Sequence, residues 1–251
     1  MRAARLGTAR LGQARRGLVR RGKGINDSNF KEIIMKTAEV MITGTTPLLM
    51  HADNIDWADK MELWKNDPKN KKKSKAGDDR TPPWRWIGCL NHDENILTIP
   101  SEYIMRCMME AAAQVPTGKG QKTFKSQSQS GLLCQEFHWP LLVAGKTVSI
   151  DDVKALMDDE LTFYDHIEQI KTMGFELFTK RARIGQAKHI RVRPRFNSWS
   201  TLGSITIIDD QITKSILGQF MDIGGQYKGL GDWRPGAKTP GPFGMFTAVV
   251  K

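Results

Sequence analysis

The residues best suited to chemistry in this sequence are arginines spaced two apart in its last third. The segment Ile190-Arg191-Val192-Arg193-Pro194-Arg195 alternates cations with apolar residues. Because successive side chains of a β-strand point to opposite faces, this pattern predicts three arginines on one face and three apolar side chains on the other. A row of arginines suits the successive phosphates of a nucleic acid strand. The alternative is a solvated sheet face whose arginines pair with acidic residues.

A glycine-rich segment near the C-terminus offers a second set of ligand-binding groups. Residues 224–246 contain seven glycines and three prolines. Glycine adopts positive φ and lets a ligand approach the backbone closely, and exposed N–H groups in such loops favour phosphate. The segment also holds Lys228, Trp233 and Arg234, whose residue types bind phosphates and stack on bases. Trp233, between glycines and beside Arg234, is the leading candidate for stacking.

Together these features predict a surface for single-stranded nucleic acid, where bases stack on aromatic rings and phosphates pair with cations. The predicted contacts come from the basic hairpin, an adjoining tryptophan and the glycine loop. They are Arg181, Arg183, Lys188, Arg191, Arg193, Arg195, Trp199, Lys228, Gly229, Gly231, Trp233, Arg234, Gly241 and Gly244.

Residues typical of catalytic centres are few. The five histidines have no spacing that indicates a metal site, and the sequence has neither a P-loop nor a dinucleotide-binding motif. We therefore expect no metal, no cofactor and no catalysis. The alternative is a metal-independent ribonuclease. Its general base would be His51, which follows a strand and a Thr-Thr-Pro turn, or His189.

Strands and helices must position these residues. The β-branched and alternating segments predict strands over 38–44, 96–99, 132–143, 175–183, 187–196, 199–208 and 245–250. Apolar periodicity predicts helices over 54–64, 101–115 and 211–223, and a partly helical acidic segment over 151–170. Ser101 and Asp210 are the expected N-caps, and Pro140 is expected to break its strand.

The remaining polar segments are lysine-rich. Residues 66–83 and 116–130 are predicted to be flexible loops that bury little and close over the ligand or contact a neighbouring subunit. Many strands with two long helices predict one α+β domain over residues 35–251. The expected architecture is a ferredoxin-like (RRM-like) antiparallel sheet with helices on one face.

Most of the excess positive charge lies in the N-terminal tail. Residues 1–35 hold nine Lys and Arg and two acidic residues, so +7 of the formal net charge of +11 lies there. Residues 1–34 are predicted to be disordered because they contain few large apolar residues. The tail could be a basic arm, an organellar transit peptide or translated upstream sequence. The third is favoured, because Lys31-Glu32 can be encoded by AAG GAG, a ribosome-binding sequence placed shortly before Met35.

Two further features narrow the class of protein. The three cysteines form no CxxC pair, which indicates neither a disulfide framework nor a zinc site and favours a reducing, cytoplasmic setting. The sequence has no apolar run of membrane-spanning length, so no membrane partner is expected.

The C-terminal segment resembles a known superfamily. Gly229-Leu-Gly-Asp-Trp-Arg-Pro235, followed by Gly241-Pro-Phe-Gly-Met-Phe246, resembles the C-terminal glycine-rich loop of the RAMP superfamily, the RNA-binding subunits of CRISPR effector complexes. The order of helix, glycine loop and terminal strand is also similar. The segment Arg193–Trp199, taken with the glycine loop, further resembles uncharacterised proteins of phages and prophages. The resemblance covers roughly residues 187–250 and, weakly, 37–50.

This resemblance implies RNA or single-stranded DNA as the ligand and a modified RRM-type sheet. It also implies side-by-side assembly along the strand, as a homo-oligomer or with effector-complex subunits, in a bacterial or phage-infected cell. Gly229, Gly231, Gly241 and Gly244 would be the loop glycines, with Lys228 and Arg234 on phosphates. Two alternatives stay open: a ribonuclease of the same superfamily, and a phage structural or interaction component whose basic surface meets acidic protein.

Overall fold

β1 (Lys36–Gly44) lies inside the larger sheet, and its alternating burial follows directly from its sequence. Ala38, Val40 and Ile42 are fully buried, while the residues between them are exposed. The computed structural model describes residues 36–251 except Ser74, so the predictions for residues 1–34 and for Met35 lie outside the described residues. No helix in the described ranges is long and apolar enough to cross a bilayer.

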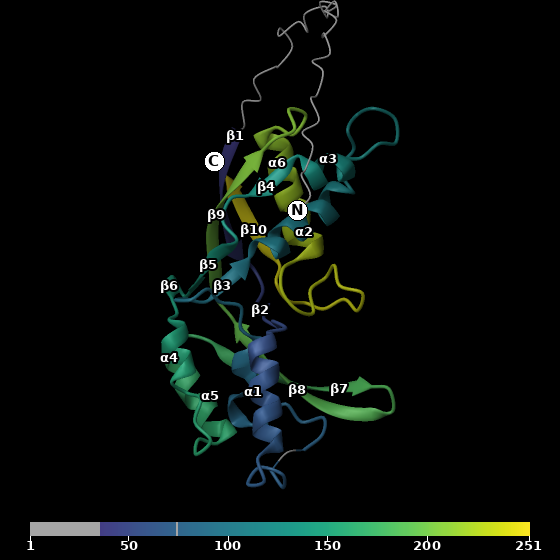
Figure 1. Ribbon diagram of the computed structural model, residues 1–251. Helices are drawn as coiled ribbons and strands as arrows, with labels where there is room; N and C mark the ends of the chain where they lie inside the picture. The colour runs from purple at the N-terminus through teal and green to yellow at the C-terminus, as the bar shows by residue number, and fades with distance from the viewer. Residues whose placement is uncertain (1–35, 74) are drawn as a thin grey trace, which may run out of the picture. The chain divides into compact units, whose positions relative to one another are not determined.

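The larger sheet has seven strands within the described residues, and all its pairs are antiparallel. Its main path runs β10-β1-β9-β5-β3, with β4 paired to β9 and β6 paired to β5 (Figure 1). The other strands are β3 (Thr98–Pro100), β4 (Leu132–Cys134), β5 (His138–Val143), β6 (Lys146–Thr147), β9 (Trp199–Ile207) and β10 (Phe246–Val250). The strands predicted at 38–44, 199–208 and 245–250 are confirmed.

Two helices cover one face of this sheet. α2 (Ser101–Ala112) and α6 (Lys214–Ile223) contact each other and bury Met108, Leu217 and Phe220. The opposite face is open. Met41 faces Leu202 on one side and Val249 on the other, and all three side chains are exposed. The mixed α+β class with antiparallel sheets is therefore confirmed.

A smaller sheet carries the basic hairpin. Its order is β2 (Leu48–Leu49), β8 (Ala187–Phe196) and β7 (Glu176–Ile184). β7 and β8 are antiparallel and pair along their full length, which confirms the predicted hairpin around Gly185. The remaining described helices of the chain are α1 (Ile55–Asn66), the 3₁₀-helix η1 (Pro83–Cys89), α3 (Lys125–Ser130), α4 (Ile150–Lys154), α5 (Phe163–Thr172) and the π-helix η2 (Gly224–Lys228).

Several local predictions are wrong for identifiable reasons. Pro100, not Ser101, is the N-cap of α2, because β3 runs directly into the helix. Thr213 caps α6 through its side chain, which accepts a hydrogen bond from the Ile216 N–H at 3.2 Å; Asp210 does not. Pro140 lies within β5 and pairs with Thr98 without ending the strand.

The lysine-rich segments are also more ordered than expected. In residues 66–83, Asn70, Asp78 and Asp79 are buried. In residues 116–130, helix α3 forms, and its residue Ser128 is fully buried. The buried polar side chains in both segments make hydrogen bonds or ion pairs with other residues of the chain. A few such buried residues can hold a lysine-rich segment in place, and amino-acid composition does not predict them.

Candidate functional site

The glycine loop packs closely on β2 instead of presenting free N–H groups. The Asp232 N–H donates to the Leu49 carbonyl at 2.9 Å, the Gly244 N–H to Pro47 at 2.8 Å and the Leu230 N–H to Gly244 at 2.8 Å. Gly244 has φ of 72°, and a Cβ there would overlap the Leu230 carbonyl. The glycines thus allow two backbone segments of the protein to pack closely against each other. The N–H groups of Gly229 and Gly241 also donate to backbone carbonyls, which corrects the prediction that the N–H groups of Gly229, Gly241 and Gly244 are open to phosphate.

Arg234 fastens this loop to α2. Its guanidinium makes two hydrogen bonds to the Glu110 carboxylate, at 2.9 and 3.0 Å, and a third to the Lys228 carbonyl at 3.0 Å. The Arg234 side chain is only 13% exposed. Burial alone would raise the pKa of Glu110, but the hydrogen bonds from Arg234 and Arg106 outweigh burial and hold this pKa below its usual range. Arg234 therefore holds the loop against α2 instead of making the predicted contact with a phosphate.

Trp233 is held at the edge of the loop in a strained backbone conformation, with φ of 48°. Its indole N–H donates to the Pro240 carbonyl at 3.1 Å, and Gly241 lies so close that a Cβ would overlap the ring. The Lys180 ammonium of β7 lies 3.1 Å from the ring centroid. Phe243 packs beside the ring at 5.5 Å between centroids. The fold thus orients Trp233 toward the basic hairpin.

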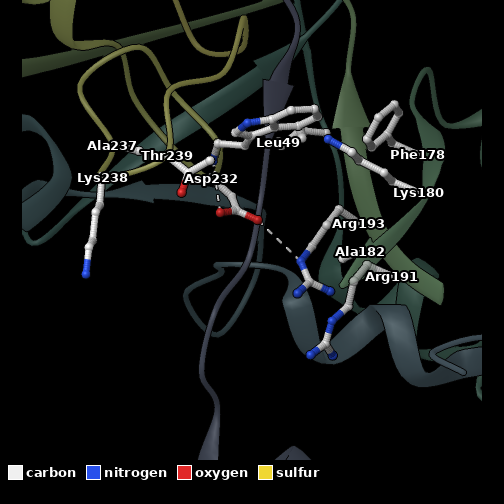
Figure 2. A pocket seen from close by; sticks show the side chains of 11 residues that line it. Leu49, Phe178, Lys180, Ala182, Arg191, Arg193, Asp232, Ala237, Lys238 and Thr239 are labelled. Carbon is white, nitrogen blue, oxygen red and sulfur yellow. Dashed lines mark hydrogen bonds and ion pairs between the residues drawn. The ribbon is translucent and has the colours of Figure 1, made fainter. Parts of the chain in front are cut away.

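A pocket of about 410 Å³ is lined by Trp233 and by residues of the hairpin. Figure 2 shows Lys180, Arg191 and Arg193 of the hairpin on one side of it and Lys238 on the other. Leu49 and two β7 side chains, Phe178 and Ala182, give it apolar walls. Cations surround these walls: Lys180, Arg191, Arg193 and Lys238. Because the pocket combines aromatic and apolar surface with positive charge, it suits a planar ring attached to an anionic group.

The arginine row forms as predicted, but each arginine has an acidic partner. Arg191 and Arg193 both contact the Asp79 carboxylate at 3.3 Å, and Arg193 also contacts Asp232 at 3.4 Å. Arg195 pairs with Glu176. The Asp79 side chain is 5% exposed, and its carboxylate also contacts the Arg85 guanidinium at 3.2 Å. The row is therefore partly neutralised within the chain, which is the alternative that the sequence left open.

The other candidate residues separate into two groups. Arg181, Arg183 and Lys188 are exposed toward the end of the hairpin, where they can reach a ligand. Trp199 is 3% exposed, covers Gly44 and donates to the Thr46 carbonyl at 2.9 Å. Trp199 is therefore a core residue, and its predicted contact with the ligand is corrected.

Sequence reasoning missed five polar or aromatic contributors to the site: Asp79, Phe178, Lys180, Asp232 and Lys238. Phe178, Lys180 and Ala182 alternate along β7, so period-two spacing could have placed all three on one face. Nothing in the sequence pattern pairs Asp79 with the hairpin arginines, because the partners lie far apart along the chain.

His51 lies beside the same cluster of charges. Its side chain is 48% exposed, and Nδ1 lies 4.0 Å from the Asp232 carboxylate. Burial and the nearby Arg193 lower the pKa of His51, although Asp232 opposes them. His51 also lines a second cleft, of about 210 Å³, together with Tyr103 and Arg106. A lowered pKa favours the neutral imidazole, which is the form that can accept a proton.

Comparison with known proteins gives no family for this chain. No protein-family model matches it, and no curated protein matches its sequence. Among the described residues, no three His, Cys, Asp or Glu side chains gather as a metal site would require. The function of the site is therefore inferred from its own residues.

Proposed function

We propose that the protein binds single-stranded nucleic acid, RNA or single-stranded DNA, without catalysing a reaction. The observation that carries this proposal is the pocket in which the Trp233 ring faces the cations of β7 and β8. A base stacks on Trp233, and its phosphates reach Arg191 and Lys238 at the rim. Bases of a duplex are stacked on each other and not free to enter, so single strands are preferred.

The energies favour a base over the lysine that now covers the ring. An exposed cation–π contact is worth about 0.5–1 kcal/mol. Stacking of a base on an aromatic side chain is worth about 1–3 kcal/mol. Lys180 is an exposed residue with a flexible side chain, so it can leave the Trp233 ring and pair with a phosphate of the incoming nucleotide.

The paired arginines still contribute to this surface. The side chains of Arg191 and Arg195 remain 33% and 31% exposed beside their carboxylate partners. Arg181, Arg183 and Lys188 are exposed further along the hairpin. Strand alternation places Arg181, Arg183 and Lys188 on the face of the hairpin opposite Lys180 and Arg191. A single strand several nucleotides long that passes around the hairpin would contact both sets of cations, with little base preference.

We further propose a ferredoxin-like arrangement for the larger sheet, as the resemblance to the RAMP superfamily implies. Two features support it. β9 separates β1 from β5, and β1 separates β10 from β9, as in two interleaved split β-α-β units. Helices α2 and α6 lie in the corresponding crossovers. The described strands β1, β9 and β10 expose no aromatic ring on the open face, so stacking is proposed at Trp233 instead of on the sheet. Assembly as repeating subunits stays a prediction.

The proposal is tested by filter binding of labelled single-stranded RNA, single-stranded DNA and duplex DNA across a salt series. We expect both single strands to bind more tightly than the duplex, with affinity falling steeply as salt rises. Absence of binding at low salt would end the proposal. If protein purified from its host carried an acidic protein and no nucleic acid, the interaction-component alternative would be favoured instead.

The second candidate is a metal-independent ribonuclease, and the position of His51 favours it. Its neutral imidazole lies next to Arg193, which could stabilise a phosphate while His51 accepts a proton from a 2′-hydroxyl. RNA cleavage that persists in EDTA and disappears in His51→Ala would support this candidate. Intact RNA after prolonged incubation with the wild-type protein would exclude it.

A further inference from the structure

Another, larger pocket includes Arg191 in its lining, and half of its ten lining residues are Lys or Arg. Its volume is about 620 Å³. Its cationic side chains are Lys65, Lys71, Lys75, Arg85 and Arg191, and the Asp79 carboxylate and the His189 ring also line it. Arg191 is shared with the Trp233 pocket, and no other lining residue is. The two pockets therefore form separate sites that meet at one guanidinium.

Backbone pairing fixes the lysine-rich segment against β8. The Ile190 N–H donates to the Gly77 carbonyl at 2.7 Å, and the Asp79 N–H donates to the Ile190 carbonyl at 2.9 Å. Gly77 has φ of 76°, and a Cβ there would overlap the His189 ring. These contacts hold the turn that carries Lys71 and Lys75 beside Arg191, so the cluster is built by the fold.

The charges of this pocket do not balance. Asp79 is its one lining carboxylate, and it already contacts Arg85, Arg191 and Arg193 at 3.2–3.3 Å. Among the described residues, no carboxylate oxygen lies within 4.0 Å of the ammonium groups of Lys65, Lys71 or Lys75. Like charges that converge in a concave site repel one another and attract a ligand of high negative charge density.

We propose that this pocket is an anion site for clustered phosphates, those of a di- or triphosphate. Backbone phosphates of a nucleic acid carry one charge each and are spread along the strand, whereas a triphosphate brings its charges into one small volume. Three lysines supply mobile donors for such a group, and Arg85 and Arg191 supply planar ones. The source is either a free polyphosphate or the 5′ end of a strand, and the site stands without the proposed strand binding.

Calorimetric titration with sodium tripolyphosphate at low salt tests this site. We expect saturable one-to-one binding that weakens at least about tenfold in the triple variant Lys65→Ala/Lys71→Ala/Lys75→Ala, through loss of charge-assisted hydrogen bonds. The control is Lys119→Ala/Lys122→Ala/Lys125→Ala, which removes the same charge from exposed residues that line neither pocket. Equal weakening in both variants, or no saturable binding by the wild type, would overturn the proposal.

A second comparison identifies the source of the phosphates. Oligonucleotides with a 5′-triphosphate or a 5′-hydroxyl are titrated against the wild type and Trp233→Ala. Tighter binding of the triphosphate form in both proteins, lost in the Lys65/Lys71/Lys75 variant, assigns the site to strand ends. Equal binding of the two oligonucleotides, with tripolyphosphate binding retained, assigns it to free polyphosphate. Because Trp233→Ala affects only the other pocket, failure of strand binding and failure of this site are distinguished.

Discussion

Lys180 and Trp233 form a cation–π contact, with the ammonium nitrogen 3.1 Å from the centroid of the indole ring. The contact joins the basic hairpin to the glycine loop, the two segments that the sequence singles out for nucleic acid binding. The Pro240 carbonyl accepts a hydrogen bond from the indole N–H and Gly241 packs against the ring, so the indole is fixed, whereas the exposed Lys180 side chain can move away from it. A ligand that stacks there replaces one weak contact with a stronger one.

Replacing Trp233 by Ala should weaken binding of a single-stranded oligonucleotide by about 5- to 100-fold, which corresponds to the loss of one stacked base. The slope of affinity against salt concentration should stay the same, because no cation is removed. Fluorescence anisotropy at several salt concentrations measures both quantities. Phe137→Ala is the control, since Phe137 is an aromatic residue, 84% exposed, that lines no part of the Trp233 pocket. Equal losses in the two variants would refute the stacking role.

Replacing Arg181 and Arg183 by Ala should lower the magnitude of the salt slope by about 1.4, because two phosphate contacts with a single strand are lost at about 0.7 each. Both residues are exposed, so the midpoint of urea unfolding should not change. Arg193→Ala should behave differently. Its side chain is 12% exposed between Asp79 and Asp232, and its removal takes one of three guanidinium partners from the buried Asp79 carboxylate, which should lower the midpoint of urea unfolding. An unchanged salt slope in the Arg181/Arg183 variant would remove the hairpin from the binding surface.

Local patterns in the sequence predict the hairpin well, because alternation along Ile190–Arg195 is a property of neighbouring residues. They do not predict what the side chains contact. The pairs Asp79–Arg193, Glu110–Arg234 and Lys180–Trp233 each join segments that are distant in the chain. A charged residue in the sequence indicates that an ion pair is favourable, but it does not indicate which residue of opposite charge forms that pair. The close contact between the glycine loop and β2 is not predicted for the same reason, since the two segments lie far apart in the chain.

The Glu110–Arg234 pair should stabilise the protein at neutral pH and not in acid. The pKa of Glu110 is lower in the folded protein, so its contribution is fully present above the unfolded-state pKa and is lost as pH falls through the folded-state pKa. Glu110→Gln should therefore lower the unfolding free energy by about 1.5–3 kcal/mol at pH 7, as for hydrogen bonds between charged groups. The difference from the wild type should shrink toward pH 3.

Urea unfolding at several pH values measures this effect. Glu168→Gln is the matched control, because Glu168 pairs with Lys171 on an exposed helix surface where ion pairs contribute little. A difference between Glu110→Gln and the wild type that does not depend on pH would contradict the assignment.

The glycine loop should tolerate a Cβ poorly where it packs on itself. Gly118→Ala should cost about 1–2 kcal/mol, since Gly118 has φ of 75° but nothing within 4 Å of the added carbon. Gly244→Ala should cost clearly more at a similar φ of 72°, because the Leu230 carbonyl must also move. Thermal unfolding of the two variants makes the comparison. Equal destabilisation would show that close packing of the loop is not what requires glycine.

The position of a bound strand is measured most directly by photocrosslinking. An oligonucleotide that carries a single 4-thiouracil or 5-bromouracil base is irradiated with the protein, and the crosslinked peptide is identified by mass spectrometry. We expect the crosslink on Trp233 or on Phe178 in the same pocket, and its loss when unlabelled single strand competes. Crosslinks confined to the open sheet face around Met41, Leu202 and Val249 would contradict the proposed site.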